Sequence, residues 1–184
     1  MYNFIETYKI DNINLCDDLI KYWKINKEYK FEGKVQGSSE SITDKMTKDS
    51  IDVCFFTPSE NKTIKSFFKQ LSNKVQEYTT KYGMVSRVQT SPQNLIQCYN
   101  KGKGYPKLHY ERCNAQLVAR QLVYMLYLNT VTDKGGTEFP YQHIITPAIK
   151  GNLIIWPAEF THPHRGVISP TQKKCIVTGW FELK

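Results

Sequence analysis

The sequence lacks any long apolar run. No stretch of about eighteen or more apolar residues occurs, so no segment is expected to span a membrane. The N-terminus, MYNFIETYKID, also lacks the basic start and apolar stretch of a secretory signal. Apolar residues make up 40% and charged residues 23% of the 184 residues, which is ordinary for a soluble globular protein. This length predicts one domain with one core over residues 1–184.

The cysteines form no recognisable motif. The five cysteines are an odd, scattered set without a CxxC pair: Cys16, Cys54, Cys98, Cys113 and Cys175. Such a set predicts buried or free thiols in a reducing compartment better than a disulfide framework or a zinc site. The expected location is therefore the cytoplasm.

The chain has no dense basic block, although its net charge is +8. Its lysines are spread along the chain and are not interleaved with aromatic residues, so we interpret them mainly as a solvated surface. Binding to nucleic acid is the weaker alternative, because a basic protein favours acidic partners.

The pattern of apolar residues divides the chain into two parts. Residues 13–28 and 60–82 carry apolar side chains on one face, as amphipathic helices do. Residues 33–50 are polar and predict a loop, and Ile51–Phe56 is a short apolar run. We expect residues 1–93 to supply supporting helices and the first strands.

From about residue 94 the pattern changes to short β-type runs. These runs cover 95–99, 107–111, 121–129, 137–141, 152–157 and 174–183, and four of the breaks between them carry glycine or proline. Many short strands predict a β-sandwich or barrel, with the two helices as outer support. The expected fold class is mainly β, in an α+β arrangement.

Histidine is also rare, and one histidine lies close to a carboxylate. His109 precedes Glu111 by two residues in LHYERC. On a β-strand, residues i and i+2 project from the same face about 6.6–6.8 Å apart, so the two side chains can converge on one metal ion. A second histidine from a distant strand would complete the two-histidine, one-carboxylate set of non-haem iron(II) oxygenases. The alternative is an exposed strand with alternating polar residues.

The last expected strand carries a second group of polar side chains. Lys174, Ile176, Thr178 and Trp180 alternate along it, so one face would present a cation, a hydroxyl and an indole. A buried lysine is costly unless it meets an anion, and a ligand carboxylate would be a natural partner. The alternative is that Lys173 and Lys174 are both solvated.

Together these segments resemble the 2-oxoglutarate- and iron(II)-dependent dioxygenases, specifically the prolyl-4-hydroxylase-like branch. The resemblance rests on CYNKGKGYPKLHYE, LVYMLYLN, GGTEFP, GNLIIWPAEFTHPHRG and KKCIVTGWF, in that order over residues 95–183. Any one of these segments is unspecific, whereas five in order are not. The resemblance implies a double-stranded β-helix (jelly-roll) core, with residues 94–184 as the catalytic core and two or more supporting N-terminal helices.

The same resemblance implies a set of site residues. Iron would be held by His109, Glu111 and His164, and Lys174 would pair with the distal carboxylate of 2-oxoglutarate (2OG). Further cosubstrate contacts would come from Tyr127, Thr178, Tyr99 and Trp180. For Tyr127 and Tyr99 the alternative is an aromatic residue in a core strand.

Two features of the ligand set stay open at this point. The family usually has aspartate where this chain has Glu111, so the strand or the rotamer must adjust to one extra methylene. In THPHRG, His162 competes with His164; His164 is preferred because it gives the family's usual spacing to the basic residue. His143 matches nothing in the family and is expected to be a surface or core residue.

The implied activity is hydroxylation of an unactivated C–H bond, with release of succinate and CO2. It would require Fe(II), 2OG and O2, with ascorbate as an optional reductant. Lysine at position 174, rather than the arginine of related nucleic-acid demethylases, favours a prolyl or other peptidyl residue of a peptide or protein substrate. The alternatives are an enzyme of this superfamily that acts on a small molecule or nucleic-acid base, and a jelly-roll binding module without catalysis.

Overall fold

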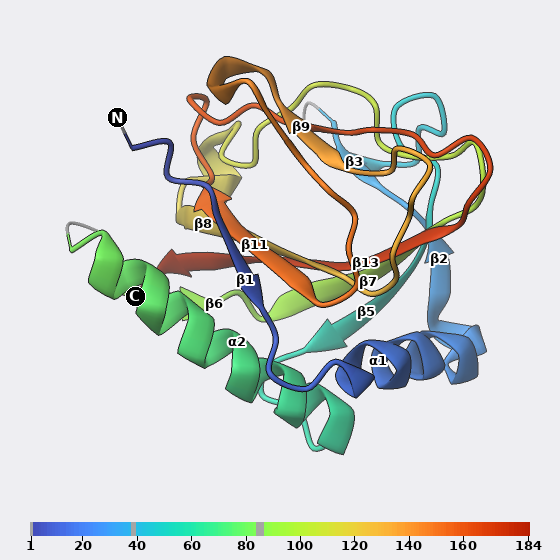
Figure 1. The fold of residues 1–184 in the computed structure, drawn as a ribbon, viewed down its shortest axis with the longest axis horizontal. Coiled ribbons are helices and arrows are strands. Elements are labelled where there is room, and N and C mark those ends of the chain that lie inside the picture. The colour runs from blue at the N-terminus through green and yellow to red at the C-terminus, as the bar shows by residue number, and fades with distance from the viewer. Residues whose placement is uncertain (1, 38–39, 84–86) are drawn as a thin grey trace.

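The computed structural model describes residues 2–37, 40–83 and 87–184. Strands hold 34% of the residues and helices 23%, so the expected mainly-β class is confirmed. Two helices, α1 (Asn14–Ile25) and α2 (Lys62–Lys81), lie along one side of the strands, while β9 (Thr137–Phe139) lies on the other side (Figure 1). The arrangement is the expected jelly roll with two supporting helices.

A large antiparallel sheet forms the centre of the fold. Its strands run in the order β1 (Glu6–Lys9), β11 (Asn152–Pro157), β8 (Arg120–Tyr127), β13 (Lys174–Leu183), β7 (Gln93–Tyr99), β5 (Ile51–Phe56) and β2 (Lys30–Glu32), and β6 (Val88–Thr90) also pairs with β13. A smaller sheet contains β10 (Ile144–Thr146), β9 and β12 (Arg165–Gly166), and a separate hairpin contains β3 (Val35–Gln36) and β4 (Ser41–Ile42). The first half of the chain therefore supplies β1, β2, β5 and β6 to the main sheet.

Local sequence explains both helices. The Asn61 side chain accepts hydrogen bonds from the backbone N–H groups of Thr63 and Ile64, at 3.0 and 3.2 Å, and so caps the start of α2. The buried face of α2 carries Ile64, Phe67, Gln70, Leu71 and Tyr78, and that of α1 carries Leu15, Cys16, Leu19 and Trp23. Both predicted helices are confirmed, although α1 ends at Ile25 because Asn26 leaves the helical region.

Residues alternate between two cores along the central strands. On β8, Leu122, Tyr124 and Leu126 pack in the core beneath the helices, whereas Val123, Met125 and Tyr127 pack between the sheets. Because successive side chains of a strand point to opposite faces, each central strand serves both cores. The large sheet thus presents one face to the helices and the other to the cavity described below.

One predicted strand is wrong. Residues 107–111 form an isolated antiparallel bridge between His109 and His164 rather than a strand. The segment lies at the cavity edge, where the amide of Glu111 also donates to the carbonyl of Ala158 at 3.2 Å. The polar segment 33–50, expected as a loop, contains the short β3–β4 hairpin.

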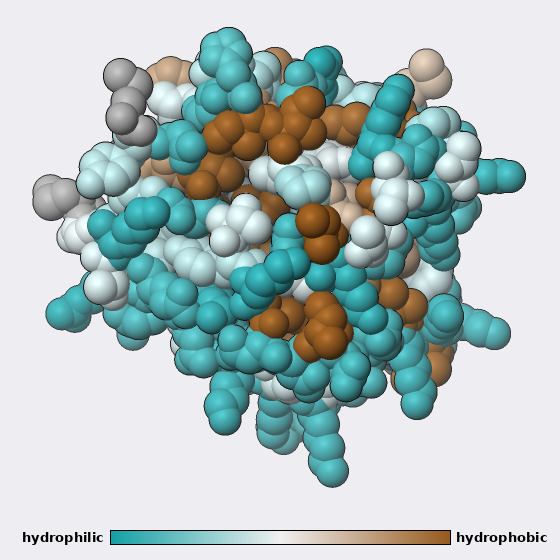
Figure 2. All heavy atoms as spheres, viewed as in Figure 1, coloured by the Kyte–Doolittle hydropathy of each residue, from teal (hydrophilic) through white to brown (hydrophobic). Residues whose placement is uncertain are grey.

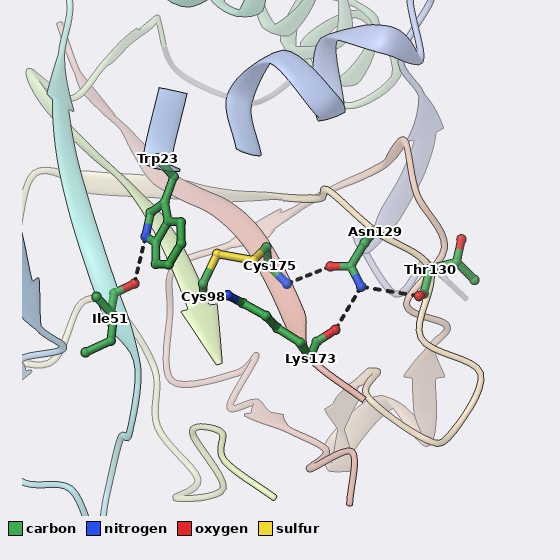
Figure 3. Close-up of a disulfide and its surroundings, with 7 residues drawn as sticks. All are labelled: Trp23, Ile51, Cys98, Asn129, Thr130, Lys173 and Cys175. Carbon is green, nitrogen blue, oxygen red and sulfur yellow. Dashed lines mark hydrogen bonds between the residues drawn. A yellow bond between two sulfur atoms is a disulfide. The ribbon is translucent and has the colours of Figure 1, made fainter. Parts of the chain in front are cut away.

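The cysteines also depart from the prediction, because Cys98 and Cys175 form a disulfide (Figure 3). The two residues are 77 positions apart in sequence but face each other directly across β7 and β13. Spacing alone could not reveal this pair, since it depends on the strand register. Cys16, Cys54 and Cys113 are free thiols.

Removal of this disulfide is expected to destabilise the fold. A Cys98→Ser/Cys175→Ser variant should lose about 4 kcal/mol of unfolding free energy, because the unfolded chain is no longer closed into a long loop. Denaturant unfolding of the variant and the parent measures the difference. Cys113→Ser, which changes an exposed free thiol, is the matched control and should leave stability unchanged; equal stability of all three proteins would contradict the expectation.

One face of the molecule is largely hydrophilic (Figure 2). Figure 2 shows one face on which hydrophilic side chains predominate and hydrophobic residues form small separate patches. Among the described residues, no helix has the length and apolar character needed to cross a membrane.

Candidate metal and cosubstrate site

A cavity of about 800 Å³ opens over the inner face of the large sheet. Its floor includes Lys174, Ile176, Thr178 and Trp180, the four alternating residues of β13. Three groups of residues line its walls: part of the β3–β4 hairpin, the segment 107–111, and the small-sheet side around Thr137 and His164. The alternation seen in the sequence therefore places these four side chains in one cavity.

Three potential metal ligands converge at this cavity. The donor atoms of His109, Glu111 and His164 all lie within 4.8 Å of one another. Glu111 Oε1 is 3.6 Å from His109 Nε2 and 3.5 Å from His164 Nε2. Two imidazole nitrogens and one carboxylate oxygen around a single point are a donor set that suits non-haem iron(II).

Backbone contacts fix the two histidines. The amide of His109 donates to the carbonyl of His164 at 3.1 Å, and the amide of His164 donates back at 2.8 Å. Nδ1 of His109 lies 2.9 Å from the carbonyl of Lys107, and Nδ1 of His164 lies 3.1 Å from that of His162. Because a carbonyl only accepts, each Nδ1 carries a hydrogen, and each Nε2 is the ring nitrogen that faces Glu111.

Electrostatics favour the ligand-competent protonation states. Burial alone would raise the pKa of Glu111, but hydrogen bonds and charge interactions with His109 and His164 outweigh it and hold that pKa well below its usual range. Burial, followed by the charge of His109, lowers the pKa of His164. These two shifts favour an ionised Glu111 and a His164 that gives up its Nε2 proton to a metal ion, as ligation requires.

The second oxygen of Glu111 is held by two residues. Trp180 Nε1 donates to Glu111 Oε2 at 2.9 Å, and Arg120 Nη1 donates to the same oxygen at 3.2 Å. The Arg120 guanidinium also stacks on the Trp180 ring, 3.6 Å from its centroid. Oε2 of Glu111, whose side chain is one methylene longer than the aspartate usual in the family, is thus held in place. Oε1 is left directed at the histidines. Sequence reasoning missed Arg120, because an irregular segment separates it from Glu111 and no spacing rule links them.

Lys174 is a buried cation at the cavity. It is only 5% exposed, and its Nζ donates to the carbonyls of Gly135 and Val167 at 2.9 and 3.4 Å. Gly135 accepts this contact from a backbone with φ of +75°, a conformation that favours glycine. Within the described ranges, Lys174 has no carboxylate partner, and burial lowers its pKa to about 8. A buried ammonium with only neutral partners fits an incoming carboxylate.

The remaining predicted contacts differ in position. Tyr99 and Thr178 line the cavity, where the Tyr99 hydroxyl donates to Gln97 Oε1 at 2.9 Å. Tyr127 is fully buried and does not line the cavity; its hydroxyl lies 2.9 Å from Thr137 Oγ1 and 3.3 Å from Thr146 Oγ1. Thr137 does line the cavity, so Tyr127 contacts a cavity residue without bordering the cavity itself.

The two other histidines lie outside the cluster. His162 Nε2 is 2.9 Å from the carbonyl of Asn3, and its Nδ1 is 2.9 Å from Thr161 Oγ1. His162 reaches the site only through its carbonyl, which orients His164. His143 is exposed, in agreement with its expected surface position.

This placement gives a direct test of the choice between the histidines. His162→Ala is expected to leave Fe(II) affinity within about twofold, whereas His164→Ala should lower it by more than about 100-fold, because removal of a direct ligand exceeds the usual effect of an outer contact. Isothermal titration with Fe(II) or Co(II) under nitrogen measures both. Loss of affinity in His162→Ala alone would reverse the assignment.

Comparisons with known proteins agree with this arrangement. The model of the 2OG-Fe(II) oxygenase superfamily matches residues 95–182. No curated protein matches the sequence. The fold is similar to the viral collagen prolyl hydroxylase of Paramecium bursaria Chlorella virus-1, solved as a 2OG complex, with a TM-score of 0.75, 17% identity, and coverage of 99% of this chain and 97% of that chain.

Two further solved structures have similar folds. A prolyl-4-hydroxylase of Pseudomonas putida has a TM-score of 0.72 and 13% identity, with 98% of this chain and 93% of that chain covered. A Trichoplax adhaerens prolyl hydroxylase in complex with a hypoxia inducible factor peptide has a TM-score of 0.73 and 14% identity, with 98% and 84% covered. Residues 95–182 therefore match the 2OG-Fe(II) oxygenase superfamily, whose dioxygenases use Fe(II), 2OG and O2, and the chain as a whole has the fold of these prolyl hydroxylases.

Proposed function

We propose that this protein is a 2OG-dependent hydroxylase of a prolyl or other residue in a peptide or protein. The observation that carries the proposal is the presence, in one cavity, of three convergent metal-ligand atoms and a buried lysine without an anionic partner among the described residues. A binding module without catalysis has no need for either feature. Their combination favours an enzyme.

The proposed metal ligands are His109 Nε2, His164 Nε2 and Glu111 Oε1. An Fe(II) ion bound there supplies, with 2OG and O2, the oxidising power for C–H hydroxylation, and 2OG leaves as succinate and CO2. The residues around the ligands keep them in place: Arg120 and Trp180 hold Glu111, and the Trp156 and Phe139 rings pack against His164 at centroid distances of 5.0 and 5.7 Å. These aromatic walls also exclude water from one side of the site.

The proposed role of Lys174 is to bind the distal carboxylate of 2OG. Lys174 lines the cavity, and its Nζ lies 5.4 Å from the ring centroid of Tyr99, which lines the cavity too. Tyr99 and Thr178 would line the cosubstrate along its length, and Tyr127 would act through Thr137. Ascorbate is proposed as the reductant that keeps the metal in the ferrous state.

A peptide substrate is supported by the shape of the cavity. Its volume of about 800 Å³ lies near the upper end of typical ligand sites, so space remains beside a cosubstrate as small as 2OG. Lys34, Val35, Gln36 and Ser41 of the β3–β4 region line one side, and Lys107, Leu108 and Tyr110 line another. An extended peptide lying between these two edges would bring one residue to the metal. The Trichoplax enzyme with a similar fold was solved with a peptide bound.

Substrate screening tests this proposal. Proline-rich peptides, free amino acids and methylated oligonucleotides would be incubated with Fe(II), 2OG and ascorbate, and succinate and oxygen incorporation would be measured by mass spectrometry. We expect a peptide to gain one oxygen atom in step with succinate release. Turnover of methylated oligonucleotides or free amino acids alone would favour the second candidate, an enzyme of this superfamily with a nucleic-acid or small-molecule substrate.

The clamp on Glu111 leads to a separate prediction. Arg120→Gln should weaken Fe(II) or Co(II) binding about 10- to 100-fold, because the carboxylate loses a charged partner that orients it. Arg165→Gln is the matched control, since Arg165 follows the ligand His164 in sequence but its side chain pairs with Glu138 rather than with Glu111. Unchanged metal affinity in Arg120→Gln would show that Trp180 alone holds Glu111.

A further inference from the structure

A second, smaller pocket lies on the opposite face of the large sheet. It has a volume of about 170 Å³, and we call it the Trp23 pocket. It is lined by Ile20, Trp23, Lys24, Asn129, Lys173 and Cys175. Cys175 belongs to the disulfide, whereas its partner Cys98 does not line the pocket. Both half-cystines are buried, and of the two it is Cys175 that borders this pocket.

The pocket is strongly basic. Lys30 Nζ lies 3.5 Å and Lys173 Nζ 4.5 Å from the centroid of the Trp23 ring, and Lys24 is part of the wall. Over the described parts of the chain, none of the three lysines forms an ion pair. Burial and then the charge of Lys24 lower the pKa of Lys173, while burial and then the charge of Lys173 lower that of Lys30. Binding of an anion would reduce the electrostatic repulsion among these lysines.

Lys24 and Lys173 line the same pocket as Cys175. Figure 3 shows the Lys173 side chain extending past the Cys98–Cys175 bond toward the Trp23 ring. Asn129 fixes this strand end, since its side chain accepts from the amide of Cys175 at 2.7 Å and donates to the carbonyl of Lys173 at 2.8 Å. Positive charge next to a disulfide attracts an attacking thiolate and stabilises the departing one.

We propose that the Trp23 pocket is the docking site of a small anionic thiol, which cleaves the Cys98–Cys175 disulfide by attack on Cys175. The thiolate sulfur forms a bond to Cys175 Sγ, the Sγ–Sγ bond breaks, and Cys98 leaves as a thiolate. A second molecule of the thiol then displaces Cys175 from the mixed disulfide. The two small thiols are oxidised to their disulfide and supply the two electrons that reduce the protein.

Cleavage of the disulfide would affect the cavity on the other side of the sheet. Cys98 and Cys175 precede and follow the cavity residues Tyr99 and Lys174, which are themselves opposite each other in the β7–β13 register. Because neighbours on a strand face opposite sides, the bond ties the strands directly behind Tyr99 and Lys174. Reduction is expected to loosen this pair and lower 2OG affinity severalfold, a consequence that rests on the proposed function.

Two thiols that differ only in charge test the docking site. Metal-free protein would be exposed to 2-mercaptoethanesulfonate or 2-mercaptoethanol at equal thiolate concentration. Loss of the disulfide and the adduct at Cys175 would be followed by acid quench, alkylation and mass spectrometry. The anionic thiol should react about tenfold faster at low ionic strength, and the advantage should shrink in high salt.

Charge variants test which lysines cause the faster reaction of the anionic thiol. Lys24→Gln/Lys173→Gln should remove most of the advantage of the anionic thiol. Lys62→Gln/Lys69→Gln, which removes the same charge from exposed positions of α2, should retain it. Equal rates for the two thiols, an adduct at Cys98, no reaction of the folded protein, or an advantage insensitive to Lys24 and Lys173 would overturn the proposal.

The 2OG affinity of the reduced and oxidised proteins is then compared by anaerobic titration with metal present. A severalfold weaker affinity after reduction supports coupling to the cavity, and equal affinities overturn that coupling. The cleavage rates are measured without metal or 2OG. They therefore test the thiol docking site independently of the proposed enzymatic activity.

Discussion

Substitution of any one proposed iron ligand by alanine is expected to lower Fe(II) affinity by more than about 100-fold, beyond the loss usual for an outer-sphere contact. In Glu111→Ala, the metal would lose its only charged ligand, and the two imidazoles would lose the carboxylate that lies 3.5–3.6 Å from them. In His109→Ala and His164→Ala, one of two nitrogen donors disappears. Anaerobic titration with Fe(II), or with Co(II) as a stable substitute, measures each loss.

Two variants show whether the loss is specific. Glu111→Gln keeps the size of the side chain and removes its charge, so it should also bind metal poorly. Glu138→Gln, on the exposed pair with Arg165, should bind normally. Thermal unfolding of each metal-free variant shows whether the fold persists. A folded Glu111→Gln variant with unchanged affinity would contradict the assignment of Glu111.

Lys174→Ala should weaken 2OG binding by about 100-fold or more, because truncating one partner of a buried charge pair costs about 2–5 kcal/mol. Metal affinity should be retained, since Lys174 does not contact the three ligands. Lys173→Ala is a close control: the side chain is next in sequence but lies on the opposite face of the sheet, in the Trp23 pocket. Equal 2OG affinity in Lys174→Ala and the parent would remove Lys174 from the cosubstrate site.

The lowered pKa of Lys174 adds a pH dependence. Because burial lowers this pKa to about 8, the ammonium is present below that pH and is lost above it. In the unfolded chain the pKa returns toward about 10.4, so protonated Lys174 destabilises the fold below pH 8, and this penalty fades as the pH rises between the two values. Affinity for 2OG should therefore fall as the pH rises above 8, while the unliganded protein gains stability.

The same reasoning predicts opposite effects for one substitution. Lys174→Met should stabilise the unliganded protein at neutral pH by about 1–3 kcal/mol, as replacement of buried charges by apolar residues often does. It should also abolish tight 2OG binding. Denaturant unfolding at two pH values measures the first effect; destabilisation at neutral pH would show that the contacts to Gly135 and Val167 outweigh the burial of charge.

Periodicity in the sequence was sufficient for the regular parts of the fold. Apolar spacing predicted α1 and α2, and alternation along β13 predicted that Lys174, Thr178 and Trp180 share a face, because both patterns repeat with the local geometry. The short polar strand β1 was missed, since an edge strand of Glu-Thr-Tyr-Lys has no apolar signal. The strand expected at 107–111 was wrong, because its residues serve the cavity rather than a sheet.

The site was predictable only in part, because some of its contacts join segments that are distant in sequence. His109 and Glu111 are neighbours in sequence, and the structure brings them to His164 through a single bridge. The Arg120 clamp, the isolation of His162 at Asn3 and the Cys98–Cys175 bond all depend on contacts between distant segments. Residue spacing contains no information about such contacts until the strand order and register are known.

Absorption spectroscopy of the anaerobic protein with Fe(II) and 2OG tests the assignment of the iron and 2OG site most directly. We expect a weak visible charge-transfer band to form when both are added to the parent protein. The band should be absent from His109→Ala and Glu111→Ala, and it should require far more 2OG in Lys174→Ala. No band with the parent protein, or an unchanged band in His109→Ala and Glu111→Ala, would contradict the site.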